Sequence, residues 1–253
     1  MTSPSSIYTH LPTRISWMIY AVLSYLIGVI GLAACILAVG NLHPGIHIAK
    51  ASPGLWSSLL VDTLLITLFA LQHSIMARQG FKQWLTRFIP IYAERATYVL
   101  LSGILLLMAV TLWMPLPGEA WNVQSQPLNT LLWIGFAFGW GYLLIATFLT
   151  NHFELFGLRQ AYLNLMAKPY TSLPFTQRGM YNYSRHPMMA GVLIGVWCHP
   201  QMSFTQLCLA ATLTIYVFAG IWFEERDLEK NFGSTYKDYK QKIGTFITPP
   251  RKS

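Results

Sequence analysis

Long apolar stretches dominate this chain and limit the folds that it can adopt. They lie near residues 15–39, 56–77, 95–114 and 128–150, with a fifth, interrupted stretch over residues 188–223. Each of the first four is close in length to the ~20 residues that a helix needs to cross a lipid bilayer. Backbone groups inside a bilayer must find hydrogen-bond partners within the protein, which favours helices. We therefore expect an all-α fold, a polytopic transmembrane helix bundle.

The composition agrees with a membrane protein. Hydrophobic residues make up 54% of the chain and charged residues only 10%, whereas a soluble domain carries about 25% charged residues. The net charge of +8 would also suit a nucleic-acid partner, but the basic residues are spread between the apolar stretches and form no basic arm. We expect the lipid bilayer as the partner, and no nucleic acid. The sequence does not indicate an oligomeric state.

The fifth apolar stretch predicts a helical hairpin. His199-Pro200-Gln201 interrupts it, and proline ends a helix because it has no backbone N–H to donate. The first arm is short, whereas the second, from about Ser203 to Phe223, is long enough to span a membrane. The prediction is therefore four spanning helices followed by a hairpin with a tight turn at Pro200.

A soluble tail follows the hairpin. Residues 224–253 are predicted to form one amphipathic helix that ends near Pro249-Pro250. We treat residues 1–253 as a single integral-membrane domain. Within it, residues 15–150 form a four-helix membrane part, and residues 175–253 form the hairpin and the tail.

The basic residues predict how the chain crosses the membrane. In this arrangement every Lys and Arg except Lys50 falls on one side. Short loops rich in Lys and Arg remain in the cytoplasm. Both termini are therefore expected in the cytoplasm, and the tail is a cytoplasmic amphipathic segment.

Polar and special residues flank the apolar hairpin. Arg185-His186-Pro187 opens it, Gly191 follows one helical turn later, and Glu224-Glu225 closes it. Such groups are costly in a membrane and usually have a function there. Pro187 bends the start of the helix and frees a backbone carbonyl, and Gly191 permits close approach of a ligand or of another helix.

The charges of this group suit a zwitterionic ligand. Arg185 can meet a carboxylate with two parallel hydrogen bonds, and Glu224 or Glu225 can meet an ammonium. The alternative is a simple ion pair between Arg185 and Glu225 within the protein. The residues themselves leave both interpretations open.

Other polar residues are predicted at the same membrane level. His73 lies near the cytoplasmic end of the second helix, and Asn151-His152 ends the fourth. Together with Arg185-His186-Pro187 they predict a small-molecule site at the cytoplasmic mouth of a membrane enzyme. For any single histidine, the alternative is a hydrogen-bonded residue at the membrane interface.

Two further groups fit such a site less well. Asp62 lies eleven residues before His73, roughly 16 Å along a helix, where we expect it to make a structural hydrogen bond. His43 and His47 have a spacing that suits a metal on a helix, but Pro44-Gly45 between them disfavours a helix. We expect no metal site, because no other cluster has the ligands for one.

The hairpin motif resembles that of a known superfamily. Tyr181-x-x-x-Arg185-His186-Pro187-x-x-x-Gly191 with a later Glu224-Glu225 is similar to the signature of the integral-membrane methyltransferases, which include isoprenylcysteine carboxyl methyltransferase and the phospholipid N-methyltransferases. The resemblance implies that the methyl donor S-adenosylmethionine binds at the cytoplasmic side of the final hairpin and tail. The residues that it implies for donor binding are Tyr181, Arg185, His186, Pro187, Gly191, Glu224 and Glu225.

Further segments resemble the bacterial methanethiol S-methyltransferase family. These segments are residues 72–78, 94–99, 151–160 and 224–228. That family transfers a methyl group from S-adenosylmethionine to methanethiol and forms dimethyl sulfide, so the resemblance implies a bacterial inner-membrane enzyme with a small thiol substrate. His73, Asn151 and His152 lie in these segments and are the implied catalytic candidates. A histidine titrates near neutral pH, so we expect His73 or His152 to take the thiol proton.

Other functions stay open. The chain could methylate another thiol, an isoprenylcysteine or a lipid. A sterol-reductase-like enzyme shares part of the tail pattern but needs a nicotinamide site, and the sequence has no glycine-rich dinucleotide motif. A transporter or a non-enzymatic membrane protein would place polar groups across the whole membrane, whereas these residues gather on one side.

Overall fold

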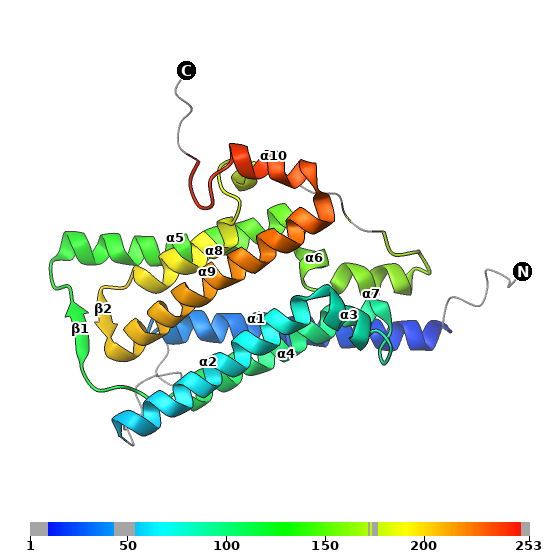
Figure 1. The fold of residues 1–253 in the computed structure, drawn as a ribbon. Helices are drawn as coiled ribbons and strands as arrows, with labels where there is room; N and C mark the ends of the chain where they lie inside the picture. The colour runs from blue at the N-terminus through cyan, green and yellow to red at the C-terminus, as the bar shows by residue number, and fades with distance from the viewer. Residues whose placement is uncertain (1–9, 43–53, 172, 174–176, 249–253) are drawn as a thin grey trace, which may run out of the picture. The chain divides into compact units, whose positions relative to one another are not determined.

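The computed structural model describes residues 10–42, 54–171, 173 and 177–248. The prediction of an all-α transmembrane bundle is confirmed (Figure 1). Among these residues, five helices are long and apolar enough to cross a membrane. They are α1 (Leu11–Val39), α2 (Leu55–Ala77), α4 (Ile91–Leu112), α5 (Gln126–Thr150) and α9 (Phe204–Phe232).

Shorter elements connect or follow these helices. The helical ones are α3 (Gln79–Leu85), α6 (His152–Leu155), α7 (Leu158–Leu165), the 3-10 helix η2 (Gly179–Asn182), α8 (Pro187–Trp197) and α10 (Ser234–Lys242), and the strands are β1 (Glu119–Asn122) and β2 (Gln201–Ser203).

The chain divides into two compact units. The first unit comprises Met1–Met114 and Asn151–Leu173, and the second comprises Pro115–Thr150 and Pro174–Ser253. The first unit therefore holds α1 to α4, α6 and α7, while α5 and all later elements of the hairpin and tail belong to the second.

In the first unit, α1 and α4 pack closely at glycines. A Cβ atom on Gly103 would lie 2.7 Å from the Cα atom of Gly28, and one on Gly31 would lie 2.6 Å from the carbonyl oxygen of Gly103. Small residues allow the backbones of membrane helices to approach in this way. Helix α2 also packs against α4 (Figure 1). The Oδ1 atom of Asp62 accepts a hydrogen bond of 2.9 Å from the backbone N–H of Met114, the structural role expected for it.

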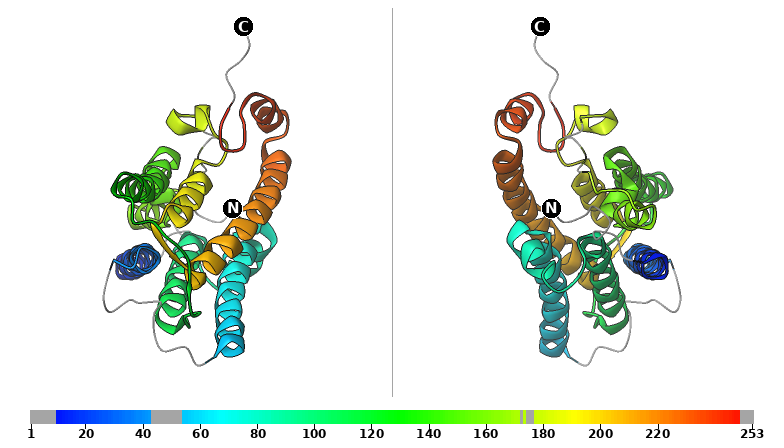
Figure 2. Two further views of the ribbon diagram at one scale, coloured as in Figure 1. Left: turned by 90° about the vertical axis from the view of Figure 1, so that its left-hand side faces the viewer. Right: turned by 90° about the vertical axis from the view of Figure 1, so that its right-hand side faces the viewer.

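In the second unit, α8 packs against α5 (Figure 2). A Cβ atom on Gly191 would lie 2.6 Å from the backbone nitrogen of Leu143 on α5. One on Gly195 would lie 2.7 Å from the indole ring of Trp140. Glycine is therefore required on this face of α8 for the packing of the two helices.

The predicted hairpin is formed by α8 and α9, and its first arm is short. The eleven residues of α8 rise roughly 16 Å, about half the ~30 Å thickness of the hydrocarbon core. After Pro200 the chain forms β2, which pairs antiparallel with β1, so that Asn122 lies opposite Gln201. The sequence pattern did not predict this small sheet. Ser203 then begins α9 with a capping box that it forms with Gln206.

The tail differs from the single amphipathic helix predicted for residues 224–253. Helix α9 continues to Phe232, and Gly233 ends it with a φ of 55°, which favours glycine. Helix α10 then ends at Lys242, well before Pro249-Pro250, which lies outside the described residues. The chain turns at Gly244 instead, where a Cβ atom would overlap the carbonyl group of Ile247.

Candidate functional site

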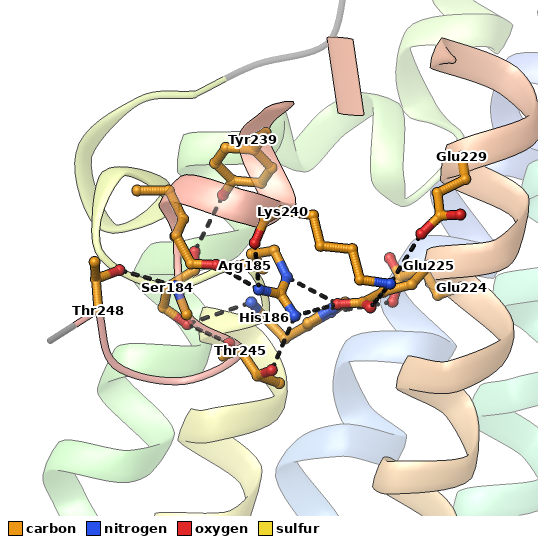
Figure 3. A network of polar contacts seen from close by, with 12 residues as sticks. Ser184, Arg185, His186, Glu224, Glu225, Glu229, Tyr239, Lys240, Thr245 and Thr248 are labelled. Carbon is orange, nitrogen blue, oxygen red and sulfur yellow. Dashed lines mark hydrogen bonds and ion pairs between the residues drawn. The ribbon is translucent and has the colours of Figure 1, made fainter. Parts of the chain in front are cut away.

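Arg185 lies at the centre of a polar network in the second unit (Figure 3). Its Nε and Nη2 atoms each lie 2.8 Å from Oε1 of Glu225. Nη2 also donates to Oγ1 of Thr245 at 2.9 Å, and Nη1 donates to the carbonyl oxygens of Lys240 and Ile243. All five N–H groups of the guanidinium thus point at protein acceptors. Arg185 forms the internal ion pair that was one of the two interpretations of the sequence.

Three basic side chains contact the carboxylate of Glu225. Besides Arg185, the Nε2 atom of His186 lies 3.1 Å from its Oε1 atom, and Nζ of Lys240 lies 2.8 Å from its Oε2 atom. Lys240 also reaches Oε1 of Glu229 at 2.8 Å. Its hydrogen bonds to Glu225 and Glu229 raise the pKa of Lys240, so this side chain stays charged well above neutral pH.

One carboxylate of the network faces outward. The Oε2 atom of Glu224 lies 3.5 Å from Nδ1 of His186, and the Glu224 side chain is 46% exposed, whereas that of His186 is 3% exposed. Apart from His186, the network combines the cations Arg185 and Lys240 with the carboxylates of Glu224, Glu225 and Glu229. The two positive and three negative charges of these five residues sum to minus one.

The turn after α10 holds this network in place. Residues 244–248 run beside residues 183–186, and the backbone N–H groups of Arg185 and His186 donate to carbonyl groups of that turn at 3.0 and 3.1 Å. The hydroxyl of Tyr239, on α10, donates to the carbonyl of residue 181 at 2.6 Å. Burial raises the pKa of Tyr239 to about 12, so it remains a donor at neutral pH.

The other predicted donor-site residues begin α8 or contact α5. Pro187 is the first residue of α8, where its missing N–H costs nothing. Gly191 packs against α5, so its contact is with a helix. The Tyr181 hydroxyl accepts a hydrogen bond of 2.7 Å from Thr150. Burial raises the pKa of Tyr181, and the negative charge of Glu224 adds to the shift.

Sequence reasoning missed three members of this network. Glu229 lies one helical turn after Glu225, so the shared face of α9 was a usable signal. Lys240 follows in a tail rich in lysine, and its spacing did not distinguish it from Lys237 or Lys242. The sequence did not point to Thr245, because only the turn of the backbone after α10 brings this residue to Arg185.

His73 lies in a separate polar group in the first unit. The Tyr98 hydroxyl is 2.8 Å from its Nε2 atom and 2.9 Å from its Nδ1 atom. Ser102 is 3.4 Å from Nδ1, and Phe69 stacks on the ring with centroids 5.2 Å apart. His73, on α2, therefore faces α4, which presents a phenol and a hydroxyl to it.

His152 forms a second histidine–tyrosine pair in the same unit. Its Nε2 atom is 3.1 Å from the Tyr25 hydroxyl, and its ring packs on that of Phe156 with centroids 4.5 Å apart. Burial lowers the pKa of His152, so the ring is neutral at pH 7. Asn151 has a φ of 105°, and its side-chain oxygen accepts a hydrogen bond from the backbone N–H of Glu154. Asn151 thus caps the short helix that carries His152.

Shared neighbours link the two histidine pairs. Phe156, which packs on His152, also packs against the buried cluster that contains Tyr98. The guanidinium carbon of Arg95 lies 4.6 Å from the centre of the Tyr98 ring, and its Nε atom donates to the carbonyl oxygen of Leu155 at 2.7 Å. The first unit therefore brings His73 and the Asn151-His152 segment into one network.

The described residues contain no group of three or more His, Cys, Asp or Glu side chains that could hold a metal ion. His43 and His47 lie outside the described residues. The Arg185 network belongs to the second unit and the histidine pairs to the first. Their convergence on a single site stays a prediction.

The chain is similar to known proteins over most of its length. The profile of the NnrU protein family matches residues 59–247. Methanethiol S-methyltransferase of Mycobacterium tuberculosis (strain ATCC 25618 / H37Rv) is 39% identical over 237 residues, which cover 93% of this chain and 97% of the relative. Methanethiol S-methyltransferase of Pseudomonas deceptionensis is 41% identical over 246 residues, 95% of this chain and 92% of the relative. That of Crocosphaera subtropica (strain ATCC 51142 / BH68) is 40% identical over 220 residues, 85% and 86% of the two chains. No solved structure matches the chain.

Proposed function

Because this chain belongs to the NnrU protein family and to the family of the methanethiol S-methyltransferases, we propose that it methylates methanethiol to dimethyl sulfide. The observation that carries this proposal is the likeness to relatives of that name over more than nine-tenths of the chain. We further propose S-adenosylmethionine as the methyl donor. The bacterial inner membrane, with both termini in the cytoplasm, is the proposed location, supported by the distribution of Lys and Arg.

The charges of the Arg185 network fit this donor. S-adenosylmethionine carries a sulfonium, an ammonium and a carboxylate, and is a net cation, whereas the network has one more carboxylate than it has Lys and Arg side chains. Carboxylates and aromatic faces both attract cations. In the proposed site, the exposed carboxylate of Glu224 and the ring of Tyr181 therefore face the positive parts of the donor.

The buried members of the network position the site. Arg185, His186 and Glu225 use their polar atoms on one another and on the tail, so their proposed role is to fix α8 and α9 around the donor. Pro187 sets the start of α8, and Gly191 its packing against α5. Lys240 has three N–H groups. Two meet Glu225 and Glu229, and its side chain is 39% exposed, so we propose that the third meets the carboxylate of the donor.

The thiol side of the reaction needs a base. When bound, the donor supplies an electrophilic methyl group on a sulfonium. The thiolate is the reactive form of a thiol, and transfer requires the sulfur in line with that methyl group. We propose that His73 or His152 takes the thiol proton, and that Asn151 positions His152 through the cap on α6. The positive charge disappears from the donor during transfer, so groups that attract a cation hold the product less strongly.

The purified full-length protein in detergent tests this function. Labelled S-adenosylmethionine is titrated for binding, and methanethiol is then added while dimethyl sulfide in the headspace is measured by gas chromatography. We expect binding and turnover. Donor binding without dimethyl sulfide would overturn methanethiol as the substrate, and no donor binding would overturn the donor itself.

Single variants test the roles of the residues. His73→Ala and His152→Ala are assayed across pH, and wild-type rates in both would remove the histidine base from the proposal. Glu224→Gln is expected to weaken donor binding, and Lys242→Gln serves as a matched tail variant outside the network. Equal donor affinity in Glu224→Gln and wild type would exclude Glu224 from the donor site.

A further inference from the structure

A chain of hydrogen bonds supports a proton on one particular nitrogen of His73. The Gln72 amide nitrogen donates to the carbonyl oxygen of Tyr98 at 3.4 Å and contacts the sulfur of Met76 at 3.1 Å. The Gln72 amide oxygen therefore faces Ser102, whose hydroxyl donates to it at 3.1 Å. A serine hydroxyl has one proton to give, so Ser102 can only accept from His73.

This chain supports one tautomer of His73. Its Nδ1 atom lies 3.4 Å from Ser102, which can accept a proton from it, so the proton of the neutral ring is assigned to Nδ1. In this tautomer Nε2 has a lone pair, and the Tyr98 hydroxyl lies 2.8 Å from it. The neutral His73 ring then accepts a proton at Nε2, beside the Tyr98 hydroxyl.

The Tyr98 hydroxyl stands in front of the basic nitrogen. It lies 2.9 Å from Nδ1 as well as 2.8 Å from Nε2, nearer to the ring nitrogens than the Ser102 hydroxyl at 3.4 Å. Phe69 stacks against the ring with an interplanar angle of 27°. The positive charge of Arg95, 4.6 Å from the Tyr98 ring centre, stabilises negative charge that passes through the phenol oxygen.

We infer that Tyr98 relays the proton of the thiol substrate to Nε2 of His73, and that His73, not His152, is the base. The S–H bond breaks and its proton moves to the Tyr98 oxygen, while the proton of Tyr98 moves to Nε2. The electron pair stays on the sulfur, which becomes a thiolate as the ring becomes an imidazolium. The thiolate then bonds to the methyl carbon, whose former bonding pair remains on the sulfur of the donor. This inference rests on the proposed function.

Two thiols of different acidity separate a relay from a structural role. In the variant Tyr98→Phe the ring remains and the relaying oxygen is lost. We expect kcat with methanethiol to fall about 100-fold or more, the usual contribution of acid–base catalysis. With trifluoroethanethiol, a more acidic thiol that supplies its own thiolate, we expect a loss of less than about 10-fold. The KM for the donor should not change.

The other tyrosine provides the matched control. Tyr25→Phe removes the hydroxyl beside His152 and is expected to change the rates with both thiols by the same factor. The double variant Tyr98→Phe with His73→Gln should be no slower than His73→Gln alone, because both residues act in one step. An additive loss would show that Tyr98 acts apart from His73.

The outcomes distinguish this inference from the function on which it rests. If the wild-type protein forms no dimethyl sulfide, the proposed function fails. If the wild type is active and Tyr98→Phe loses the same factor with both thiols, the relay alone is overturned. Should Tyr98→Phe not fold, as judged by lost donor binding, Ser102→Ala tests the same chain. We expect this variant to show the same dependence on thiol acidity, and its absence would overturn the assigned tautomer.

Discussion

Arg185 and Glu225 lie forty residues apart in the sequence, yet two nitrogens of the arginine lie 2.8 Å from one oxygen of the glutamate. Their side chains are only 9% and 10% exposed. The pair therefore joins the segment before α8 to the C-terminal part of α9, away from most of the solvent. Removing one partner of a buried ion pair leaves the other charge without compensation.

The two adjacent glutamates should respond differently to neutralisation. Glu225→Gln removes the negative charge that holds Arg185, so we expect unfolding to become easier by about 3–5 kcal/mol. Glu224→Gln changes a half-exposed side chain, and its stability should stay within about 0.5 kcal/mol of wild type. Thermal unfolding in detergent measures both, and donor titration is expected to show weaker binding in each. Equal stability losses would contradict the different burial of the two residues.

Lys240 predicts a loss of stability at alkaline pH. Its hydrogen bonds to Glu225 and Glu229 raise its pKa in the folded protein above the unfolded value of about 10.4. A raised pKa means that the stabilisation is complete below about pH 10.4 and is lost as the pH rises through the folded value. The stability difference between wild type and Lys240→Gln should thus be constant near neutral pH and shrink in strong alkali.

Lys242→Gln is the control for this prediction, since Lys242 is an exposed residue of the same helix. Its unfolding temperature should follow that of the wild type over the whole pH range. A difference between wild type and Lys240→Gln that stays the same in strong alkali would contradict the role of the charge on Lys240.

The membrane helices could be predicted from sequence because apolar length alone decides them. The stretches near residues 15–39 and 56–77 became Leu11–Val39 and Leu55–Ala77, with the ends shifted by a few residues. The pairing of β1 with β2 could not be predicted, because its partners lie about eighty residues apart and neither strand has a pattern of its own. The break of the tail at Gly233 requires a positive φ at that residue. Glycine can adopt such a φ, but its presence does not predict that it will.

The candidate site could likewise be predicted from the sequence only in part. The residue types of Arg185 and Glu225 indicated the chemistry of each side chain. The sequence did not indicate that the two side chains pair with each other. Thr245 reaches Arg185 only because the chain turns after α10. The tautomer assigned to His73 rests on a hydrogen bond between Gln72 and Ser102, thirty residues apart. Contacts of this kind come from packing between elements, which local sequence does not specify.

Gly191 should be intolerant of a methyl group. In Gly191→Ala the new Cβ atom would lie 2.6 Å from the backbone nitrogen of Leu143. A backbone atom inside a helix cannot move away from this contact as the end of a flexible side chain could. We expect a loss of about 1–3 kcal/mol, measured by thermal unfolding, and weaker donor binding because the start of α8 shifts.

Gly141→Ala on α5 is the matched control for this prediction. A Cβ atom there meets nothing within 4 Å, so the variant should be as stable as wild type or gain up to about 1 kcal/mol from the better helix former. Wild-type stability in Gly191→Ala would show that α5 and α8 separate easily.

Asn151 offers a test that separates a cap from a catalytic amide. Its side-chain oxygen accepts a hydrogen bond of 3.1 Å from the backbone N–H of Glu154 and so begins α6, which carries His152. Aspartate keeps that oxygen and loses the amide nitrogen, whereas alanine loses the cap at a cost of about 0.5–2 kcal/mol. If Asn151 acts only through the position of His152, Asn151→Asp should retain most of the methyl-transfer rate and Asn151→Ala should lose both stability and rate.

The rate of dimethyl sulfide formation and the unfolding temperature measure the two effects. A stable but inactive Asn151→Asp would instead place the amide nitrogen among the groups that touch the reactants.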